Sequence, residues 1–418
     1  MPEIESLSGL EILDSRGRPT VAACCKLKLG PEAWASVPSG ASTGKAEAME
    51  LRDGDPRRYG GLGCRRAVEN VNGPLARALI GGQFDNQREL DEALLALDGT
   101  QDKSRLGANA ILAISIAFAR AAAAAQGVEL YQHFAHLIGG SPRQLPRLTV
   151  NLFSGGKHAG GQVRIQDVLL VPRSAMTIDE SLAATYAVYQ SAAKLCAQKY
   201  ASRPLVADEG GLAPPFPNAD AMLGDAVEAI HAAGLDPGRD VALAVDLASS
   251  HFYCDGRYRL DGVSLSPPQM IDRVIGWLDR YPIISLEDAL AEDDWKHWPA
   301  LRQAVGGRAL VLGDDLLCTN PQRIARAIES NCADALLLKV NQIGTLTQAA
   351  QALAMARAAG WSVTISARSG ETEDNWLADL AVGWSADHIK IGSITRSERL
   401  AKYNRLLAIE AQTHFPLA

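Results

Sequence analysis

The sequence has no excess of positive charge, since 41 lysine and arginine residues stand against 48 aspartate and glutamate residues and the formal net charge is -7. A chain without a basic face lacks the attraction that binds the phosphates of nucleic acid. Hydrophobic residues make up 47% and charged residues 21%, which is ordinary for a globular protein. We therefore expect no nucleic-acid partner and favour chemistry on a small molecule.

Cysteine motifs and long apolar runs are also missing. The seven cysteines show no paired spacing of the kind that binds zinc, and we interpret them as reduced thiols that serve in packing. The longest apolar tract, residues 110–125, is interrupted by Ser115 and Arg120, and the first residues, MPEIESLSG, lack a basic region followed by an apolar core. These absences predict no membrane partner, no export and a cytoplasmic location.

A repeated design fills the last two-fifths of the chain, where short apolar runs each stop at a charge. The run LVLGDDLL, residues 310–317, ends in two aspartates and is typical of a strand buried on both faces. The residues at which six such runs stop are Asp246, Glu287, Asp314, Lys339, Arg368 and Lys390. They lie 22 to 41 residues apart, near the roughly 30 that a strand, a helix and the return require. The spacing predicts six successive βα units.

Two more strand-like runs, LTVNLFS and QDVLLVP, and two helical stretches precede these units, so the order is ββαα(βα)6. Eight strands form a closed barrel whose interior side chains can just fill. Upstream, strand-like runs followed by helical patterns predict a small antiparallel sheet with helices, and the segment GGSP at 139–142 is the best boundary. We expect an α/β fold with an N-terminal α+β cap domain in residues 1–138 and an eight-stranded (β/α) barrel in residues 139–418.

Three of the strand ends carry carboxylates. The residues past the C-terminal ends of barrel strands converge on one mouth, so Asp246, Glu287 and Asp314 should meet there. Hard oxygen ligands without cysteine or histidine alongside suit magnesium. The alternative is that they are solvated loop acids, but three in register with no compensating lysine adjacent in the chain favour a metal site.

Lys339 ends an almost wholly apolar strand, ALLLKV. Burial, a nearby metal and the neighbouring Lys390 would each lower the pKa of its ammonium group toward that of a general base. The alternative is a structural lysine that pairs with an acid in the barrel. Sequence alone leaves both interpretations open.

Further candidates lie in loops. DEGGLAPP places Glu209 between the two early helices, and HAGG and IQDVLL place His158, Gln166 and Asp167 near the first strands, with Glu209 and Asp167 as candidate acids. A lone histidine is more often structural than catalytic. VPSGASTGK, residues 37–45, is not a phosphate-binding Walker loop, because Ser39 stands where that motif needs glycine. It is either a hydroxyl-bearing lid or a surface turn.

Ten stretches, in order along nearly the whole chain, resemble motifs of the enolase family. They are LDSRGRPT, VPSGASTG, LGANAIL, GGKHAGG, DEGGLAP, SLEDALAEDDW, GDDLLCTN, LLLKVNQIGT, RSGETED and IKIGSITRSERLAKYN. So many ordered matches are highly specific for fold and ancestry, although a shared fold does not settle the substrate.

The resemblance implies a magnesium enzyme, with two ions per site, that converts 2-phosphoglycerate to phosphoenolpyruvate, and it implies a homodimer. Asp246, Glu287 and Asp314 would hold the first ion and Ser42 would help to hold the second. Lys339 would be the base, and Glu209 would be the acid for the departing hydroxyl. The positions that match contacts to the small phosphorylated or phosphonylated carboxylic acid are His158, Gln166, Arg368, Ser369 and Lys390.

The sequence departs from the family pattern where chemistry is expected. Ala367 stands where the family carries histidine, and Asp167 stands where it carries glutamate. Smaller departures are Ser154 for asparagine and Ala207 for glycine. The first change removes a proton donor, and the second draws a carboxylate back by about one carbon bond. Proton abstraction is expected to be intact, while loss of the leaving group or the shape of the substrate is in doubt.

These departures predict a specialised paralogue, for which a carboxyphosphonoenolpyruvate synthase-like enzyme of phosphonate natural-product biosynthesis is the named alternative. A second alternative is a non-catalytic family member used for binding or structure. A racemase of the wider superfamily would need a second base, typically in a K-x-K strand motif, and the sequence has none.

Overall fold

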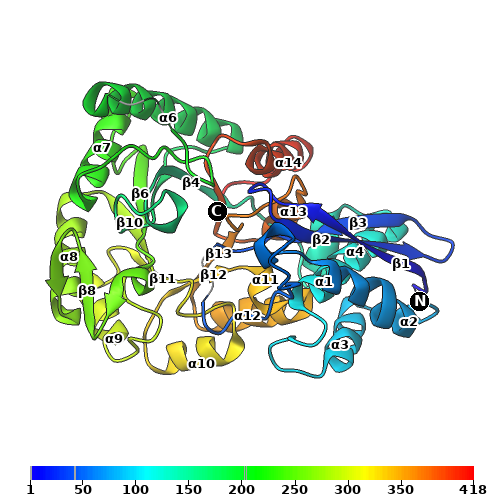
Figure 1. The fold of residues 1–418 in the computed structure, drawn as a ribbon. Coiled ribbons are helices and arrows are strands. Elements are labelled where there is room, and N and C mark those ends of the chain that lie inside the picture. Colours follow the sequence, from blue (N-terminus) through cyan, green and yellow to red (C-terminus); the bar gives the residue numbers. More distant parts are fainter. Residues whose placement is uncertain (1, 42–43, 202, 204) are drawn as a thin grey trace.

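The structure, a computed structural model, describes residues 2–41, 44–201, 203 and 205–418 and consists of a small N-terminal part beside a barrel (Figure 1). The N-terminal part begins with the antiparallel strands β1 (Ile4–Leu13), β2 (Pro19–Leu27) and β3 (Glu32–Ser36). Its helical segments are η1 (Tyr59–Gly61), α1 (Arg65–Asn70), the π-helical η2 (Val71–Leu75), α2 (Ala76–Leu79), α3 (Gln87–Asp98), α4 (Ala108–Gln126) and α5 (Leu130–Leu137). The predicted α+β cap is therefore confirmed.

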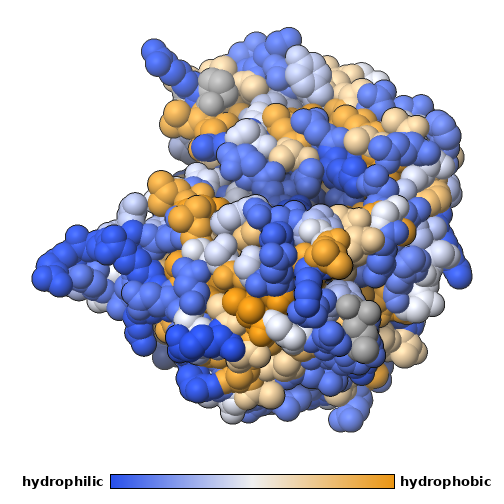
Figure 2. Space-filling model, turned by 90° about the vertical axis from the view of Figure 1, so that its right-hand side faces the viewer, coloured by the Kyte–Doolittle hydropathy of each residue, from blue (hydrophilic) through white to orange (hydrophobic). Residues whose placement is uncertain are grey.

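Helix α4 is the core of the N-terminal part. Alanine and isoleucine dominate it, and it packs against β2 and β3 on one side and α3 and α5 on others. Within the described residues it is the one helix long and apolar enough to cross a membrane, yet 83% of its most apolar window is buried inside the protein. A helix that is apolar all round belongs in a core as readily as in a bilayer. On the face shown in Figure 2, hydrophobic residues are interspersed among hydrophilic ones.

The rest of the chain forms a closed eight-stranded barrel in the order β10-β11-β12-β13-β14-β4-β5-β6. The barrel strands are β4 (Arg147–Ser154), β5 (Asp167–Pro172), β6 (Val241–Asp246), β10 (Ile283–Glu287), β11 (Leu310–Gly313), β12 (Ala335–Leu338), β13 (Ser362–Ser366) and β14 (His388–Gly392). The predicted fold class is confirmed. Seven strands point the same way, and β5 runs antiparallel to both of its neighbours, β4 and β6. The short loop 155–166 imposes this reversal, because a parallel return needs a longer crossover.

Helices surround the barrel. They are α6 (Ile178–Tyr200), α7 (Ala219–Ala232), α8 (Pro267–Arg280), α9 (Trp298–Val305), α10 (Pro321–Glu329), α11 (Val340–Ile343), α12 (Leu346–Ala358), α13 (Trp376–Gly383) and α14 (Ser397–Thr413). Short turns η3 (Gly156–His158) and η4 (Ser249–Phe252) and a small sheet of β7 (Tyr253–Cys254), β8 (Arg257–Leu260) and β9 (Val263–Leu265) occupy loops. Six of the seven cysteines are buried as predicted, whereas Cys254 on β7 is exposed.

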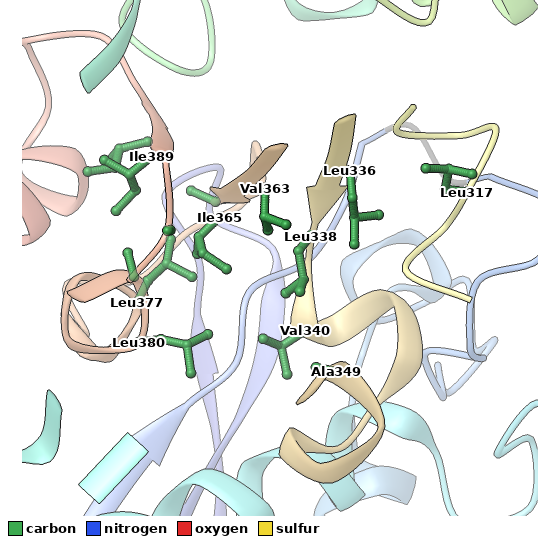
Figure 3. Packing of buried hydrophobic residues seen from close by; sticks show 14 of the residues in the cluster. Leu317, Leu336, Leu338, Val340, Ala349, Val363, Ile365, Leu377, Leu380 and Ile389 are labelled. Atoms are coloured by element: carbon green, nitrogen blue, oxygen red, sulfur yellow. The ribbon is translucent and has the colours of Figure 1, made fainter. Parts of the chain in front are cut away.

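Side chains of the barrel strands alternate between the helices outside and the barrel interior. Leu336 and Leu338 of β12 and Val363 and Ile365 of β13 belong to the large hydrophobic cluster that also includes α12 and α13 (Figure 3). Leu337 lies in a separate small cluster inside the barrel. Because the side-chain period of a strand is two, the residue that follows Leu338 points inward as Leu337 does. By the same alternation, the side chains at the ends of the strands point into the mouth of the barrel.

Candidate active site

Five strand-end side chains meet at the barrel mouth. Asp246 and Glu287 are register partners at the ends of β6 and β10, Asp314 follows β11, Lys339 follows β12, and Lys390 lies in β14. Each is at most 9% exposed. The convergence predicted from the spacing of the apolar runs is therefore what the barrel produces.

Lysines neutralise the three carboxylates. Lys390 Nζ lies 2.9 Å from Asp246 Oδ2 and 2.8 Å from Glu287 Oε2, and Lys339 Nζ lies 2.5 Å from Asp314 Oδ2. No lysine is adjacent to these acids in the chain, but Lys339 and Lys390 arrive from strands remote in sequence and pair with them in space. Burial acts against ionisation of Asp246, but Lys390 outweighs it and lowers the pKa to about 2. Burial and the Asp246 charge raise the pKa of Glu287, which shares the same lysine.

The pKa of Lys339 moves opposite to the predicted direction. Burial lowers it, but the Asp314 and Glu287 carboxylates together outweigh the lowering influences and the pKa is raised. Lys390 acts in the predicted, lowering sense, and Arg368, for which no such effect was predicted, also lowers the pKa. The other oxygen of Asp314 accepts a hydrogen bond of 2.9 Å from Gln342, so this acid is held from both sides. Of the carboxylates that raise the pKa of Lys339, Asp314 acts most strongly and Glu287 next.

One small cavity, of about 20 Å³, gathers the predicted residues. Every predicted catalytic and substrate-binding residue except Asp167 lines it: Lys339, Glu209, His158, Gln166, Arg368, Ser369 and Lys390. Ala367 also lines it, where the motif comparison led us to expect histidine. Gln166 donates to Asp246 at 3.2 Å and leaves its own buried carbonyl oxygen without a partner among the described residues. The cavity therefore has acid, base and cationic groups on its walls and room for about one water molecule.

His158 lies between two acids. Its Nδ1 is 3.0 Å from Asp167 Oδ2, and its Nε2 is 3.8 Å from Glu209 Oε1. Burial acts to lower the pKa of His158, but the Asp167 and Glu209 charges raise it to about 9. Burial raises the pKa of Glu209, whereas His158, Arg399 and Lys390 outweigh burial and lower it. Near neutral pH the pair of His158 and Glu209 therefore holds one proton, on the imidazole.

Family models match both parts of the chain. The model described as "Enolase, N-terminal domain" matches residues 4–134, and the model described as "Enolase, C-terminal TIM barrel domain" matches residues 142–414. The chain belongs to the enolase family. Membership in the enolase superfamily indicates a lyase-type enzyme, and enolase-family domains typically bind a divalent metal. The domain boundary between residues 138 and 139 stays a prediction.

Two departures from the enolase pattern contact each other. Asp167 is fully buried, and its Oδ1 accepts hydrogen bonds from Ser154 Oγ at 2.8 Å and Asn151 Nδ2 at 2.7 Å, while Oδ2 faces His158. The predicted catalytic acid Asp167 does not line the cavity. Its carboxylate is drawn into the wall, where the short serine meets it, and there it orients the imidazole of His158.

The loop after β13 carries Arg368 and Ser369 and is fixed from two directions. Arg368 donates to Glu47 at 3.0 Å and to Asn341 at 2.9 Å, so the segment that follows the predicted lid reaches the mouth. From α14, the fully buried Arg399 donates to the carbonyl oxygens of Arg368 and Ser369, each at 2.6 Å. The main chain of this loop is therefore held by a side chain from another element. Ser42 lies outside the described residues.

Two further acids, to which the sequence analysis gave no role of their own, adjoin the assigned carboxylates. Asp288 accepts from the backbone amides of Asp314 at 3.0 Å and Asp315 at 2.7 Å. Burial and the Asp315 and Asp314 charges raise the pKa of Asp288 well above its ordinary value, and burial and Asp314 raise that of Asp315 to about 7. Asp288 directly follows Glu287 in SLEDAL, and Asp315 directly follows Asp314 in GDDLL. The sequence therefore showed a second acid beside each of these two assigned residues.

Three-residue groups whose ligand atoms lie within 4.8 Å of one another occur twice in the described part of the chain: His158 with Asp167 and Glu209, and Asp288 with Asp314 and Asp315. The predicted set of Asp246, Glu287 and Asp314 is not drawn together this closely, because the two lysines lie among its oxygens. The chemical type of these ligands nevertheless fits a hard divalent cation, since all three residues offer carboxylate oxygens from adjacent strands. The surplus of buried acids that raises the pKa values of Asp288 and Asp315 also favours a cation here.

Proposed function

We propose that this protein is a magnesium-dependent enolase-family enzyme that forms an enolate from 2-phosphoglycerate or a close analogue and eliminates water to give a phosphoenolpyruvate-type product. The observation that supports it best is the meeting of Lys339 and Glu209 on the walls of one buried cavity, beside three carboxylates and the cations Arg368 and Lys390. Burying so many charges is costly, and such clusters are typical of functional sites. This cost argues against a non-catalytic family member.

Magnesium is proposed as the cofactor, with two ions per site. Asp246, Glu287 and Asp314 would hold the first, and Ser42 would help to hold the second. Bound there, the metal would supply positive charge for the second negative charge that an enolate carries beside a carboxylate.

Lys339 is proposed as the base that takes the proton from the carbon beside the carboxylate. It must be neutral to act, and the ion pair with Asp314 opposes this. Engagement of Asp314 elsewhere would remove the strongest influence that raises the pKa of Lys339. Burial, Arg368 and Lys390 would then lower it against the weaker influence of Glu287. Asp314 is therefore the main acid that opposes deprotonation of the base.

Glu209 and His158 are proposed to handle the departing hydroxyl. The proton that the pair shares is on His158, 3.8 Å from Glu209, and the Asp167 carboxylate holds the imidazole in place. Proton delivery to the leaving oxygen would thus draw on this pair. Asp167 acts through His158 and is a positioning residue in this scheme.

The cavity wall at Ala367 favours a specialised substrate. A methyl group stands where an imidazole was expected, so one proton donor is missing and the wall has a different shape. A carboxyphosphonoenolpyruvate synthase-like activity on a phosphonylated acid is therefore kept as the second candidate. We also propose that the protein forms a homodimer and is located in the cytoplasm. Family membership alone supports this part of the proposal.

Exchange of the substrate's C2 proton with deuterated water tests this assignment. Lys339→Ala should abolish the exchange, whereas Glu209→Gln should keep it and block the elimination, because base and acid act on different bonds. Proton NMR of 2-phosphoglycerate follows both events. Lys194→Gln, an exposed lysine on α6, is the control and should behave as wild type. Wild-type exchange in Lys339→Ala would mean that the base lies elsewhere.

A further inference from the structure

A second cavity, of about 260 Å³, lies beside the active site. It is bounded by the loop 155–166 between β4 and β5 and by the turn η4 after β6. Lys157, which directly precedes His158, lines it together with Arg164 and His251. The pKa of His251 responds to the charges of Asp246 and His158, so the cavity and the catalytic residues are within electrostatic reach of one another.

Among the residues that the structure describes, the cations of this cavity have no counter-ion. Lys157 and Arg164 are exposed, and neither side chain forms a hydrogen bond or ion pair with another described residue. Among the described residues that line the cavity, none is acidic. Burial first, and Lys157 next, lower the pKa of His251 to about 4, so the imidazole is neutral and can donate an N–H. Two cations and a donor around one hollow attract an anion.

The backbone of the same loop is open to a ligand. Gly160 and Gly161 line the cavity with φ of 78° and 80°, a region that glycine adopts at no steric cost. A Cβ atom added at Gly160 would meet nothing within 4 Å. The amides of both glycines donate to no other residue in the described ranges. The loop can therefore bring backbone donors close to an oxyanion.

We propose that Lys157, Arg164 and His251 form an oxyanion subsite for a further phosphoryl or carboxylate group on an extended substrate of the same active site. This rests on the proposed function, in which Arg368, Lys390 and the magnesium that the carboxylates at the mouth would hold already account for one carboxylate and one phosphate. A tethered group favours this subsite over a free anion, because its effective concentration beside His158 is high once the rest of the substrate is bound.

The matched probes are 2-phosphoglycerate and 2,3-bisphosphoglycerate, which differ by one phosphoryl group, titrated calorimetrically into the full chain with magnesium. Every protein in this series, the one called wild type included, also carries Glu209→Gln, which blocks the elimination so that the heat reports binding. Wild type should bind the bisphosphate more tightly. The double variant Lys157→Gln with Arg164→Gln should weaken bisphosphate binding roughly 10- to 100-fold and 2-phosphoglycerate binding less than about twofold. The control, Arg66→Gln with Lys194→Gln, removes two exposed charges that do not line the cavity and should change neither.

Inorganic phosphate titrated into protein saturated with 2-phosphoglycerate distinguishes the source of the anion. Phosphate binding that depends on Lys157 and Arg164 would support the subsite but assign it to a free anion. His251→Glu, which adds negative charge to the wall, should weaken either ligand. Equal loss of both organic probes, or the same loss in the control variant, would overturn the subsite. These binding experiments need no turnover, so they stay decisive even if the C2 proton exchange fails.

Discussion

At the scale of the residue, the contacts of Asp167 explain how a shortened carboxylate can be accommodated. Ser154 and Asn151 donate to one oxygen and His158 faces the other, so the acid has a partner for each oxygen inside the wall. A longer asparagine at position 154 would compete for the space that the serine leaves. Ser154 and Asp167, the two departures from the family pattern, therefore form one local rearrangement. Through it Asp167, which was expected to line the cavity, becomes a partner of His158.

The first residue-scale prediction concerns pH. Folding raises the pKa of His158 from 6.5 to about 9, so its contribution to stability is fully present below about pH 6.5 and is lost as pH rises through about 9. Asp167→Asn should lower the pKa of His158, because one of two facing carboxylates loses its charge. NMR titration of the imidazole measures it. Asp91→Asn, another fully buried acid, is the control, and an unchanged His158 pKa in Asp167→Asn would contradict the prediction.

The second prediction restores the family residues. Activity on 2-phosphoglycerate should be roughly 10²- to 10⁴-fold below that of a housekeeping enolase, the usual effect of losing a general acid or its orienting partner. Ala367→His with Asp167→Glu should raise it more than the two single changes combined, since both would act on one leaving group. Asp167→Glu alone should destabilise the fold, because a fully buried site must accept one more methylene.

The measurement is the absorbance of the phosphoenolpyruvate formed by wild type, both single variants and the double variant. Denaturant unfolding of the same four proteins separates loss of activity from loss of stability. Wild-type activity equal to that of ordinary enolases would show that the departures are silent.

At the scale of the element, helix α14 serves as a support for the substrate loop. Arg399 is fully buried and holds the carbonyl oxygens of Arg368, Ser369 and Ile391. One turn further along, Lys402 is equally buried and holds the carbonyl of Thr372. The position of Arg368 in the mouth is thus determined by a helix that does not line the catalytic cavity.

The third prediction follows from this support. Arg399→Met should lower the free energy of unfolding by about 3 kcal/mol, because it leaves buried carbonyl groups without donors. It should also lower kcat/KM by up to about 100-fold, since a displaced loop misplaces Arg368. Steady-state kinetics and denaturant unfolding measure both. Arg405→Met, on the same helix but paired with Asp379, should leave kcat/KM near that of wild type. Equal kinetics in the two variants would rule out the positioning role.

At the scale of the whole molecule, the barrel concentrates buried carboxylates at one end, and only a few cations balance them. A bound cation should therefore stabilise the entire fold by linkage. At a magnesium concentration 100 times its dissociation constant, the gain should be about 2.7 kcal/mol. Asp314→Asn should lose most of it, because a neutral amide replaces a charged ligand.

Thermal unfolding with and without magnesium measures this fourth prediction, and calorimetric titration gives the dissociation constant that it needs. Asp98→Asn, which replaces a buried acid of the N-terminal part, is the matched control and should keep the magnesium response of wild type. An unchanged unfolding temperature in saturating magnesium would remove the metal assignment.

Much of the barrel could be predicted from the sequence because its signals are local. An apolar run that stops at a charge marks both a strand and the residue at its end. The sequence alone therefore places five residues at one mouth: Asp246, Glu287, Asp314, Lys339 and Lys390. The alternation of side chains then aims all five inward. The reversal of β5 was not predicted, because it depends on how a short loop closes between two strands.

The sequence by itself determined the fold class, the family and which residues reach the barrel mouth, because strand ends, periodicity and motifs are properties of consecutive residues. Only the tertiary structure decided which charges face one another. Lys390 neutralises Asp246 across 144 positions of sequence, Asp314 raises the pKa of Lys339 where a lowered value was expected, and Asp167 turns to His158 instead of the cavity. Electrostatic effects depend on distance in space and on burial, and both are fixed only when the barrel closes.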